Sequence, residues 1–176
     1  MLQPESFVRG QWFGPGDGAQ VIVSPVDGQP IARAGTAPGD MAAAVAWARD
    51  IGGPALRAMN IHDRARMVKA LALYLTDRKE ELYALNPLTG ATRKDGWIDI
   101  EGGIMTMATM ASKARREMPD GMVHLEGGVE RLSRDGTFLG RHIAVPLRGV
   151  AVQINAFNFP VWGMLEKLAP ALLAGV

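Results

Sequence analysis

One asparagine, Asn158, lies where an apolar run meets a helix-forming run, a placement that could support chemistry on a negatively charged atom. Residues 150–154 have the composition of a strand, and the residues from Pro160 onward have that of a helix. A turn between a strand and a helix directs free backbone N–H groups and the Asn158 amide to one point, which suits an oxyanion or a phosphate. The sequence therefore predicts an anion-stabilising site at this turn.

The residues alone leave two interpretations of Asn158 open. Asparagine is a preferred N-cap residue, so Asn158 could only cap the helix that follows. Alternatively, its side-chain N–H could donate to a developing oxyanion, a contact worth about 3 kcal/mol. From Asn158 alone the capping interpretation is favoured. Phe157, Phe159 and Pro160 are expected to exclude water there, which adds weight to the second interpretation because hydrogen bonds are stronger away from water.

Lys167 lies nine residues beyond Asn158 in the same expected helix. A solvated helix lysine is the default interpretation, and a lysine paired with Glu166 or Glu130 is the next. Position alone does not support a role in proton relay. Pro170 is expected to kink this helix or end it early, and Gly175 is expected to follow its last residue.

Other polar groups are weaker candidates. Asp99 and Glu101 are two residues apart, so on a helix they face different ways and joint acid–base work is disfavoured. The glycines of 14–18 lack the GxGxxG spacing and no helix opens after them, so this segment is expected to be a turn.

Composition excludes several classes of site. The 176 residues contain no Cys, which excludes a disulfide, a thiolate zinc site and a cysteine nucleophile within them. The three His are far apart, so no metal site is expected. A net charge of +1 gives no indication of nucleic-acid binding, and neither a secretory signal nor a membrane span is visible. The cytoplasm is the expected location.

Helices and strands must position these residues. Short strands separated by turns are expected over 5–35, with apolar pieces at 7–8, 21–23 and 31–32. Helices are expected from residue 41 to the Gly-Gly-Pro at 52–54, from the N-cap Asn60 to about Leu85, and over about 98–116. The apolar stripes of the second and third helices are expected to be buried; they comprise Ile61, Ala65, Val68, Leu71 or Ala72, and Leu75, and then Ile100, Ile104, Met107, Ala111 and Ala114.

Residues 130–149 fit a β-hairpin with Asp135–Gly136 at its turn. An isolated two-stranded hairpin is barely stable in water, so this one needs further contacts. Contact with another subunit and packing on its own domain are both compatible with the residues.

Several motifs resemble the aldehyde dehydrogenase superfamily. The family carries an Asn-Phe-Pro segment, a later Lys and a Pro-Ala-Leu run ending in Gly, which match Asn158-Phe159-Pro160, Lys167 and 170–175. The resemblance implies an α/β fold, of which this chain is the N-terminal part: an incomplete Rossmann-like cofactor domain plus an oligomerisation hairpin. It also implies that Asn158 is the oxyanion donor and that Lys167 lies in a proton-exit path. The backbone contacts to NAD or NADP would come from Ile154, Asn155, Ala156 and Phe157.

The segments 53–59, 88–93 and 97–103 are similar to one branch of this superfamily. That branch comprises the semialdehyde dehydrogenases of aerobic phenylacetate degradation, where the dehydrogenase is half of a bifunctional protein, and those of benzoate degradation. The resemblance implies oxidation of a CoA-linked semialdehyde to the acid, and a homo-oligomer formed through the hairpin.

The same resemblance predicts three parts: 1–129 from the cofactor-binding domain, 130–149 as the hairpin, and 150–176 as the truncated start of the Rossmann-like core. The nucleophilic Cys, general-base Glu and cofactor-ribose Lys of the family lie later in the chain than Gly175. The 176 residues alone are therefore expected to be inactive. The alternative is a stand-alone oligomerisation or interaction module without catalysis.

Overall fold

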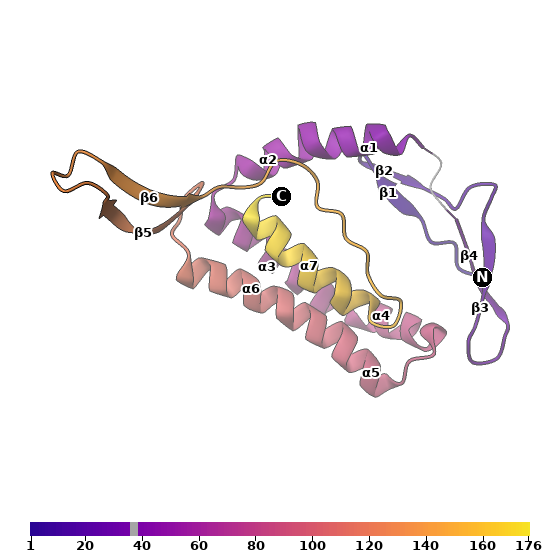
Figure 1. Cartoon of the computed structure of the whole chain (residues 1–176). Helices are drawn as coiled ribbons and strands as arrows, with labels where there is room; N and C mark the ends of the chain where they lie inside the picture. Colours follow the sequence, from indigo (N-terminus) through magenta and orange to yellow (C-terminus); the bar gives the residue numbers. More distant parts are fainter. Residues whose placement is uncertain (36–38) are drawn as a thin grey trace.

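The structure is a computed structural model that describes residues 1–35 and 39–176. Packed helices form its centre, and short antiparallel strand pairs form its N-terminal part and a projecting arm (Figure 1). The strands are β1 (Ser6–Val8), β2 (Gln11–Phe13), β3 (Gln20–Val23), β4 (Pro30–Ala34), β5 (His124–Arg131) and β6 (Leu139–Ala144). The helices are α1 (Met41–Trp47), α2 (Gly53–Arg57), α3 (Ile61–Asp77), α4 (Lys79–Leu85), α5 (Arg93–Trp97), α6 (Gly103–Glu117) and α7 (Pro160–Ala174), with π-helical turns η1 (Ala48–Gly52) and η3 (Ile98–Gly102) and a 3₁₀ turn η2 (Asn86–Thr89).

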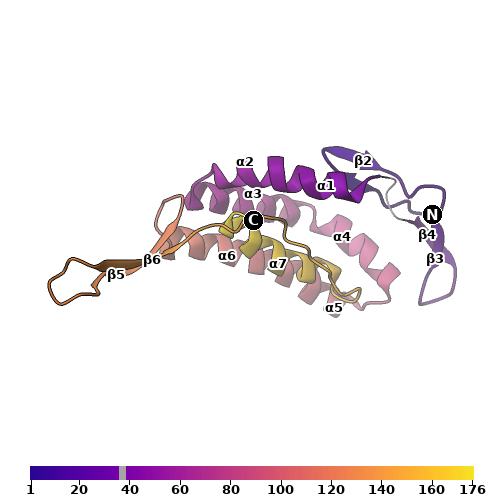
Figure 2. The same ribbon diagram turned by 45° about the horizontal axis from the view of Figure 1, so that its top comes forward.

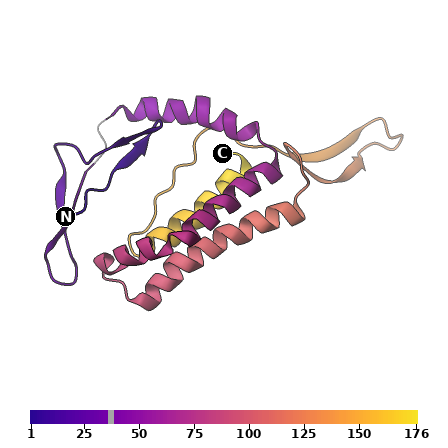
Figure 3. The same ribbon diagram turned by 180° about the vertical axis from the view of Figure 1, so that it is seen from behind.

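The hydrophobic core lies where α3, α6 and α7 pack side by side, as views from opposite sides show (Figures 1 and 3). Val68 of α3, Met107 of α6 and Leu165 of α7 are fully buried at its centre. The buried stripes predicted for the two longer helices are confirmed, although Leu71 and Leu75 are only partly buried. Three helices thus share one core, and α7 is held along its length by the other two.

The first helical stretch continues through the residues that were expected to end it. Asp40 caps α1 by accepting the N–H of Ala43, and the chain then passes through η1 into α2. The prediction that residues 52–54 end the helix is wrong because Pro54 occupies the first turn of α2, where its missing N–H removes little hydrogen bonding. The stretch extends to Arg57 instead.

The other two predicted helices differ at their boundaries. The second is interrupted at Arg78, whose φ of −110° and ψ of 11° are not helical, so α3 and α4 are separate. The third begins five residues earlier than expected, at Arg93, where Thr92 caps α5 by accepting the N–H of Asp95. It then runs through the π-helical turn η3 into α6.

The strands form three two-stranded antiparallel pairs: β1 with β2, β3 with β4, and β5 with β6. Strand β2 was not predicted; it follows β1 through a tight turn in which Arg9 and Gly10 both have positive φ. Among the described residues, the only parallel pairing is a bridge between Leu2 and Ala32. The Rossmann-like sheet is therefore not formed within residues 1–35 and 39–176.

The β5–β6 hairpin projects beyond the helices in two different views (Figures 1 and 2). It begins at His124, six residues before the expected start at 130, and its second strand ends at Ala144. The predicted turn at Asp135–Gly136 is confirmed: Asp135 accepts from Ser133 and Thr137, and Gly136 has a φ of 75°. A register shift between Glu126 and Glu130 marks a bulge.

Candidate functional site

The N-terminus of α7 is anchored by a residue from another element, and not by Asn158. The helix begins at Pro160 after Phe159, which makes no side-chain cap hydrogen bond. The carboxylate of Asp99, in η3, instead accepts the backbone N–H of Trp162 at 2.7 Å and of Val161 at 3.4 Å. The capping interpretation of Asn158 is therefore wrong.

Asp99 is the residue of this site that sequence reasoning missed. It is only 4% exposed, although carboxylates are rarely buried unless they are paired or hydrogen-bonded. The sequence did contain a sign of this burial, because Asp99 directly precedes Ile100, the first residue of a predicted apolar stripe. Its neighbour Glu101 points elsewhere, to Lys79 and Tyr83, so the prediction that the two carboxylates face different ways is confirmed.

Glycines let η3 and α6 approach the start of α7 closely. A Cβ at Gly103 would lie 2.8 Å from the Cα of Trp162 and 3.0 Å from its backbone N. A Cβ at Gly102 would lie 2.5 Å from the Trp162 ring. These contacts are shorter than real Cβ atoms make, so the missing side chains are what bring Asp99 within reach of the α7 backbone.

The backbone N–H groups of the first α7 turn are already occupied. Pro160 has no N–H, those of Val161 and Trp162 go to Asp99, and that of Gly163 goes to the carbonyl of Phe159. The prediction of free backbone donors at this helix start is therefore wrong for the helix itself. The side-chain amide of Asn158 is exposed and makes no hydrogen bond to any described residue. It is thus a free donor at this turn.

The residues predicted to contact the cofactor form an exposed, extended segment before α7. Ile154 is 89% exposed and Phe157 is 90% exposed, and Asn155 and Ala156 are also exposed. Phe157 therefore does not exclude water from Asn158, contrary to expectation. The strand expected over 150–154 is absent because a strand requires a hydrogen-bonded neighbour, and no described residue supplies one.

Lys167 lies one turn after Gly163 in α7, and its side chain forms hydrogen bonds within the same helix. Its Nζ donates to the carbonyl of Gly163 at 2.8 Å and to Glu166 Oε1 at 3.3 Å, so of the interpretations considered for Lys167 the structure shows the second, a pairing with Glu166, and not the default of a solvated lysine. Glu166 also accepts the indole N–H of Trp162 at 2.9 Å. A Cβ at Gly163 would lie 3.6 Å from the Asn155 Cβ and 3.7 Å from Lys167 Nζ, so the side chains of Asn155 and Lys167 both lie over this glycine.

Pro170 does not end α7, which continues to Ala174. Of the two outcomes predicted there, a kink or an early end, the early end is wrong because the preceding turns are fixed by the core contacts of Leu165 and Ala169, both fully buried. Gly175 ends the helix as predicted, with a φ of 86° and an N–H that reaches the carbonyls of Ala171 and Leu172.

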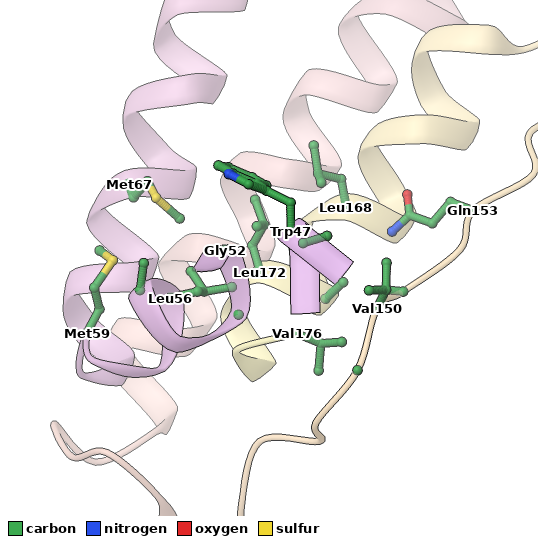
Figure 4. A pocket seen from close by; sticks show the side chains of 16 residues that line it. Trp47, Gly52, Leu56, Met59, Met67, Val150, Gln153, Leu168, Leu172 and Val176 are labelled. Atoms are coloured by element: carbon green, nitrogen blue, oxygen red, sulfur yellow. The ribbon is translucent and has the colours of Figure 1, made fainter. Parts of the chain in front are cut away.

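A cavity of about 580 Å³ lies beside the extended segment (Figure 4). Val150 and Gln153 line it from this segment, and Leu168 and Leu172 line it from α7; Trp47, Leu56 and Met67 contribute from the helices opposite. The lining is almost wholly apolar, so the cavity presents surface for packing and not groups for chemistry.

The described residues contain no group of three or more His, Cys, Asp or Glu arranged to hold a metal ion. Among the same residues, none of the helices combines the length and the apolarity that crossing a bilayer requires.

The candidate site is thus an exposed asparagine next to a helix start that a buried carboxylate from another element anchors. The chain belongs to the aldehyde dehydrogenase family, whose model matches residues 12–176. A curated relative, the 3,4-dehydroadipyl-CoA semialdehyde dehydrogenase of Aromatoleum evansii, is 41% identical over 97% of this chain and 33% of its own length. The chain thus spans about a third of the length of the curated relatives it matches.

Solved structures agree on the fold. A crystal structure of indole-3-acetaldehyde dehydrogenase in apo form is 26% identical, with a TM-score of 0.80 over 99% of this chain and 39% of that chain. The structure of PnpE in complex with nicotinamide adenine dinucleotide is also 26% identical, with a TM-score of 0.78 over 99% of this chain and 34% of that one. The predicted fold, that of the N-terminal part of an aldehyde dehydrogenase, is confirmed.

Proposed function

We propose that this chain is the N-terminal part of an NAD- or NADP-dependent dehydrogenase that oxidises a CoA-linked semialdehyde to the acid in aerobic aromatic degradation. The observation that carries the proposal is the exposed, unbonded amide of Asn158 at the start of α7. The 41% identical relative, named as a CoA-semialdehyde dehydrogenase, supports the substrate class. The phenylacetate and benzoate pathways are both compatible with this class.

Asn158 would stabilise the oxyanion that develops on the aldehyde oxygen when a nucleophile attacks its carbonyl carbon. Its side-chain N–H is the suitable donor because the first-turn N–H groups of α7 are bonded to Asp99 and Phe159. A donor that forms no bond in the ground state can be directed at charge that exists only in the transition state. Asp99 would hold the helix start, and so the turn carrying Asn158, in one place.

The extended segment fits a nicotinamide cofactor. Within the described residues, the backbone of Ile154, Asn155, Ala156 and Phe157 forms no hydrogen bond, so its N–H and C=O groups can bond to a ligand laid along them. A bound nicotinamide cofactor supplies a two-electron hydride acceptor. In this role the residues orient the cofactor, and Lys167, beside Asn155, would take part in moving a proton away from the site.

The remaining catalytic groups are assigned to parts of the protein outside these residues. The 176 residues contain no Cys, and they span about a third of the relatives' length. A thiol nucleophile and a general base must therefore come from elsewhere in a working enzyme. We assign residues 1–129 to the cofactor-binding domain, 130–149 to the oligomerisation arm and 150–176 to the start of the cofactor-binding core, in a cytoplasmic homo-oligomer.

The hairpin favours a second candidate function, a stand-alone interaction module. The hairpin exposes large apolar side chains, including Val129, Phe138, Leu139 and Ile143, each more than half exposed. Such surface is typical of a protein–protein contact. This function needs neither a nucleophile nor a cofactor. The two candidates therefore differ in whether the full-length protein reduces NAD or NADP when an aldehyde is present.

Aldehyde-dependent reduction of NAD or NADP tests the proposal. The coding sequence beyond codon 176 should continue the family and supply a cysteine, and the full-length protein should reduce the cofactor with a CoA-linked semialdehyde. The 176-residue chain alone should give no turnover. A stop codon directly after residue 176, or turnover by the 176-residue chain itself, would refute this assignment, and the first result would leave the interaction module as the function.

A further inference from the structure

Glu166, in α7, accepts a hydrogen bond on each oxygen of its carboxylate. The indole N–H of Trp162 donates to Oε2 at 2.9 Å, and Lys167 Nζ donates to Oε1 at 3.3 Å. Lys167 Nζ also donates to the carbonyl of Gly163 at 2.8 Å. One carboxylate therefore links a tryptophan to a lysine, and both acceptors of the lysine belong to earlier residues of the same helix.

The pairing of Glu166 with Lys167 is not the one that their separation in the sequence favours. Adjacent side chains of a helix point about 100° apart, whereas residues three or four apart are neighbours on its surface. The Lys167 side chain nevertheless turns back by one helical turn to reach the Gly163 carbonyl. Gly163 leaves room for this conformation, since even a Cβ there would lie 3.7 Å from Nζ. The ammonium is thus drawn towards the start of α7 by two acceptors.

Trp162 provides a fixed anchor for Glu166. Its backbone N–H donates to Asp99 at 2.7 Å, and its ring lies so close to Gly102 that a Cβ there would come within 2.5 Å of it. Both contacts come from η3, so an element other than α7 holds the tryptophan. A partly exposed Glu–Lys pair usually contributes little, because two flexible side chains must be held in one geometry. Here the indole N–H fixes the carboxylate, so only the lysine remains to be ordered.

The place where the Lys167 ammonium is held is next to the segment assigned to the cofactor, since Asn155 covers the same glycine, Gly163. Oxidation of an aldehyde by NAD or NADP and water gives the acid, the reduced cofactor and one proton, so a proton must leave the site. We propose that Glu166 is a positioning residue for Lys167: fixed by Trp162, it keeps the ammonium over Gly163, where it can take part in moving that proton. This inference rests on the proposed dehydrogenase function.

Kinetics of the full-length protein test the link between these residues. Glu166→Gln replaces one acceptor oxygen by an NH₂ group, so it cannot accept from both Trp162 and Lys167. Trp162→Phe removes the indole N–H and keeps a ring against Gly102. Each should lower kcat about 10-fold, with KM for the cofactor almost unchanged. Lys167→Met should lower kcat about 10²-fold, and in its background neither of the other substitutions should lower kcat further, because both act through the ammonium.

The matched control is Glu117→Gln, the same substitution in another Glu–Lys pair. Glu117 lies 3.8 Å from Lys113 in α6 and takes no part in the proposed network, so its loss should leave kcat unchanged. An equal loss of kcat in this control would show a general effect of charge and would overturn the proposal. Independent, multiplying losses of kcat in Glu166→Gln and Lys167→Met would overturn it too, because Glu166 would then act without the lysine.

Crystal structures of the full-length parent and of Trp162→Phe give a second readout, which does not depend on turnover. In the parent, Lys167 Nζ should bond to Glu166 and to the Gly163 carbonyl; in Trp162→Phe, the ammonium should leave at least one of these acceptors. Glu166→Gln crystals provide the same comparison should Trp162→Phe not fold. An unmoved ammonium in the variants would overturn the proposal even if the protein is a dehydrogenase. A parent that reduces neither NAD nor NADP would instead refute the dehydrogenase function, and the crystal structures would still decide whether Glu166 positions Lys167.

Discussion

The buried carboxylate of Asp99 accepts the backbone N–H of Trp162 at 2.7 Å and thereby joins η3 to the start of α7 across 63 residues of sequence. Helix starts are usually capped by a residue next to them in the chain. Here the cap comes from another element, so the position of the Asn158 turn depends on the packing of η3 and α6 against α7. A change at Asp99 should therefore affect both the stability of the chain and the geometry of the turn.

Asp99→Ala should destabilise the chain by about 2–4 kcal/mol, because it removes a cap and leaves two partly buried N–H groups without acceptors. Urea denaturation measures the change. Asp99→Asn keeps one acceptor oxygen and should cost less. Asp40→Ala is the matched control, since Asp40 caps the exposed start of α1 and its loss should cost about 1 kcal/mol. An Asp99→Ala loss no larger than the control would show that the long-range cap is unimportant.

Gly103→Ala should cost about 1–3 kcal/mol, because the new Cβ would meet the backbone of Trp162, which cannot rotate away. Gly14→Ala is the control: a Cβ there meets nothing within 4 Å, so its effect should be close to zero. Chemical denaturation of both variants gives the comparison. Equal stability of the two variants would mean that α6 and α7 can move apart at this point without a loss of folding free energy.

Much of the helical core was predictable because it depends on local periodicity. The stripe from Ile100 to Ala114 repeats at three and four residues, and these positions are buried as expected. The interruption at Arg78 was not predictable, because no helix-breaking residue lies there or directly before it.

The candidate site was only half predictable, for a physical reason. Asn158 was found because its identity and place in a motif are local. The residue that anchors the turn, Asp99, is more than fifty residues away, and no spacing rule joins the two. The free helix N–H groups were expected from a general property of helix ends, which a long-range carboxylate overrides in this chain.

The turn of the hairpin should respond to acid. Hydrogen bonds from Ser133 and Thr137 lower the pKa of Asp135 to about 2 from an ordinary value of 3.8. Because the folded pKa is the lower one, the stabilising effect of this carboxylate is present above about pH 3.8 and is lost as the pH falls towards 2. The protection of the Thr137 and Phe138 amides relative to their intrinsic exchange rates, followed by NMR, should therefore decrease over this range. Asp135→Asn should abolish this change in protection; its persistence would assign the transition to another group.

Asn158→Ala separates the chemical role of the amide from any structural role. In the full-length enzyme, the substitution should lower kcat about 10²-fold or more, because an oxyanion donor acts in the transition state. The stability of the 176-residue chain should be almost unchanged, because the exposed amide bonds to no described residue. Asp99→Asn is the informative comparison, since it weakens the anchor and leaves Asn158 in place: a smaller loss of kcat is expected, with the main cost in stability. A near-normal kcat for Asn158→Ala would remove Asn158 from the chemistry and leave the turn as a purely structural feature.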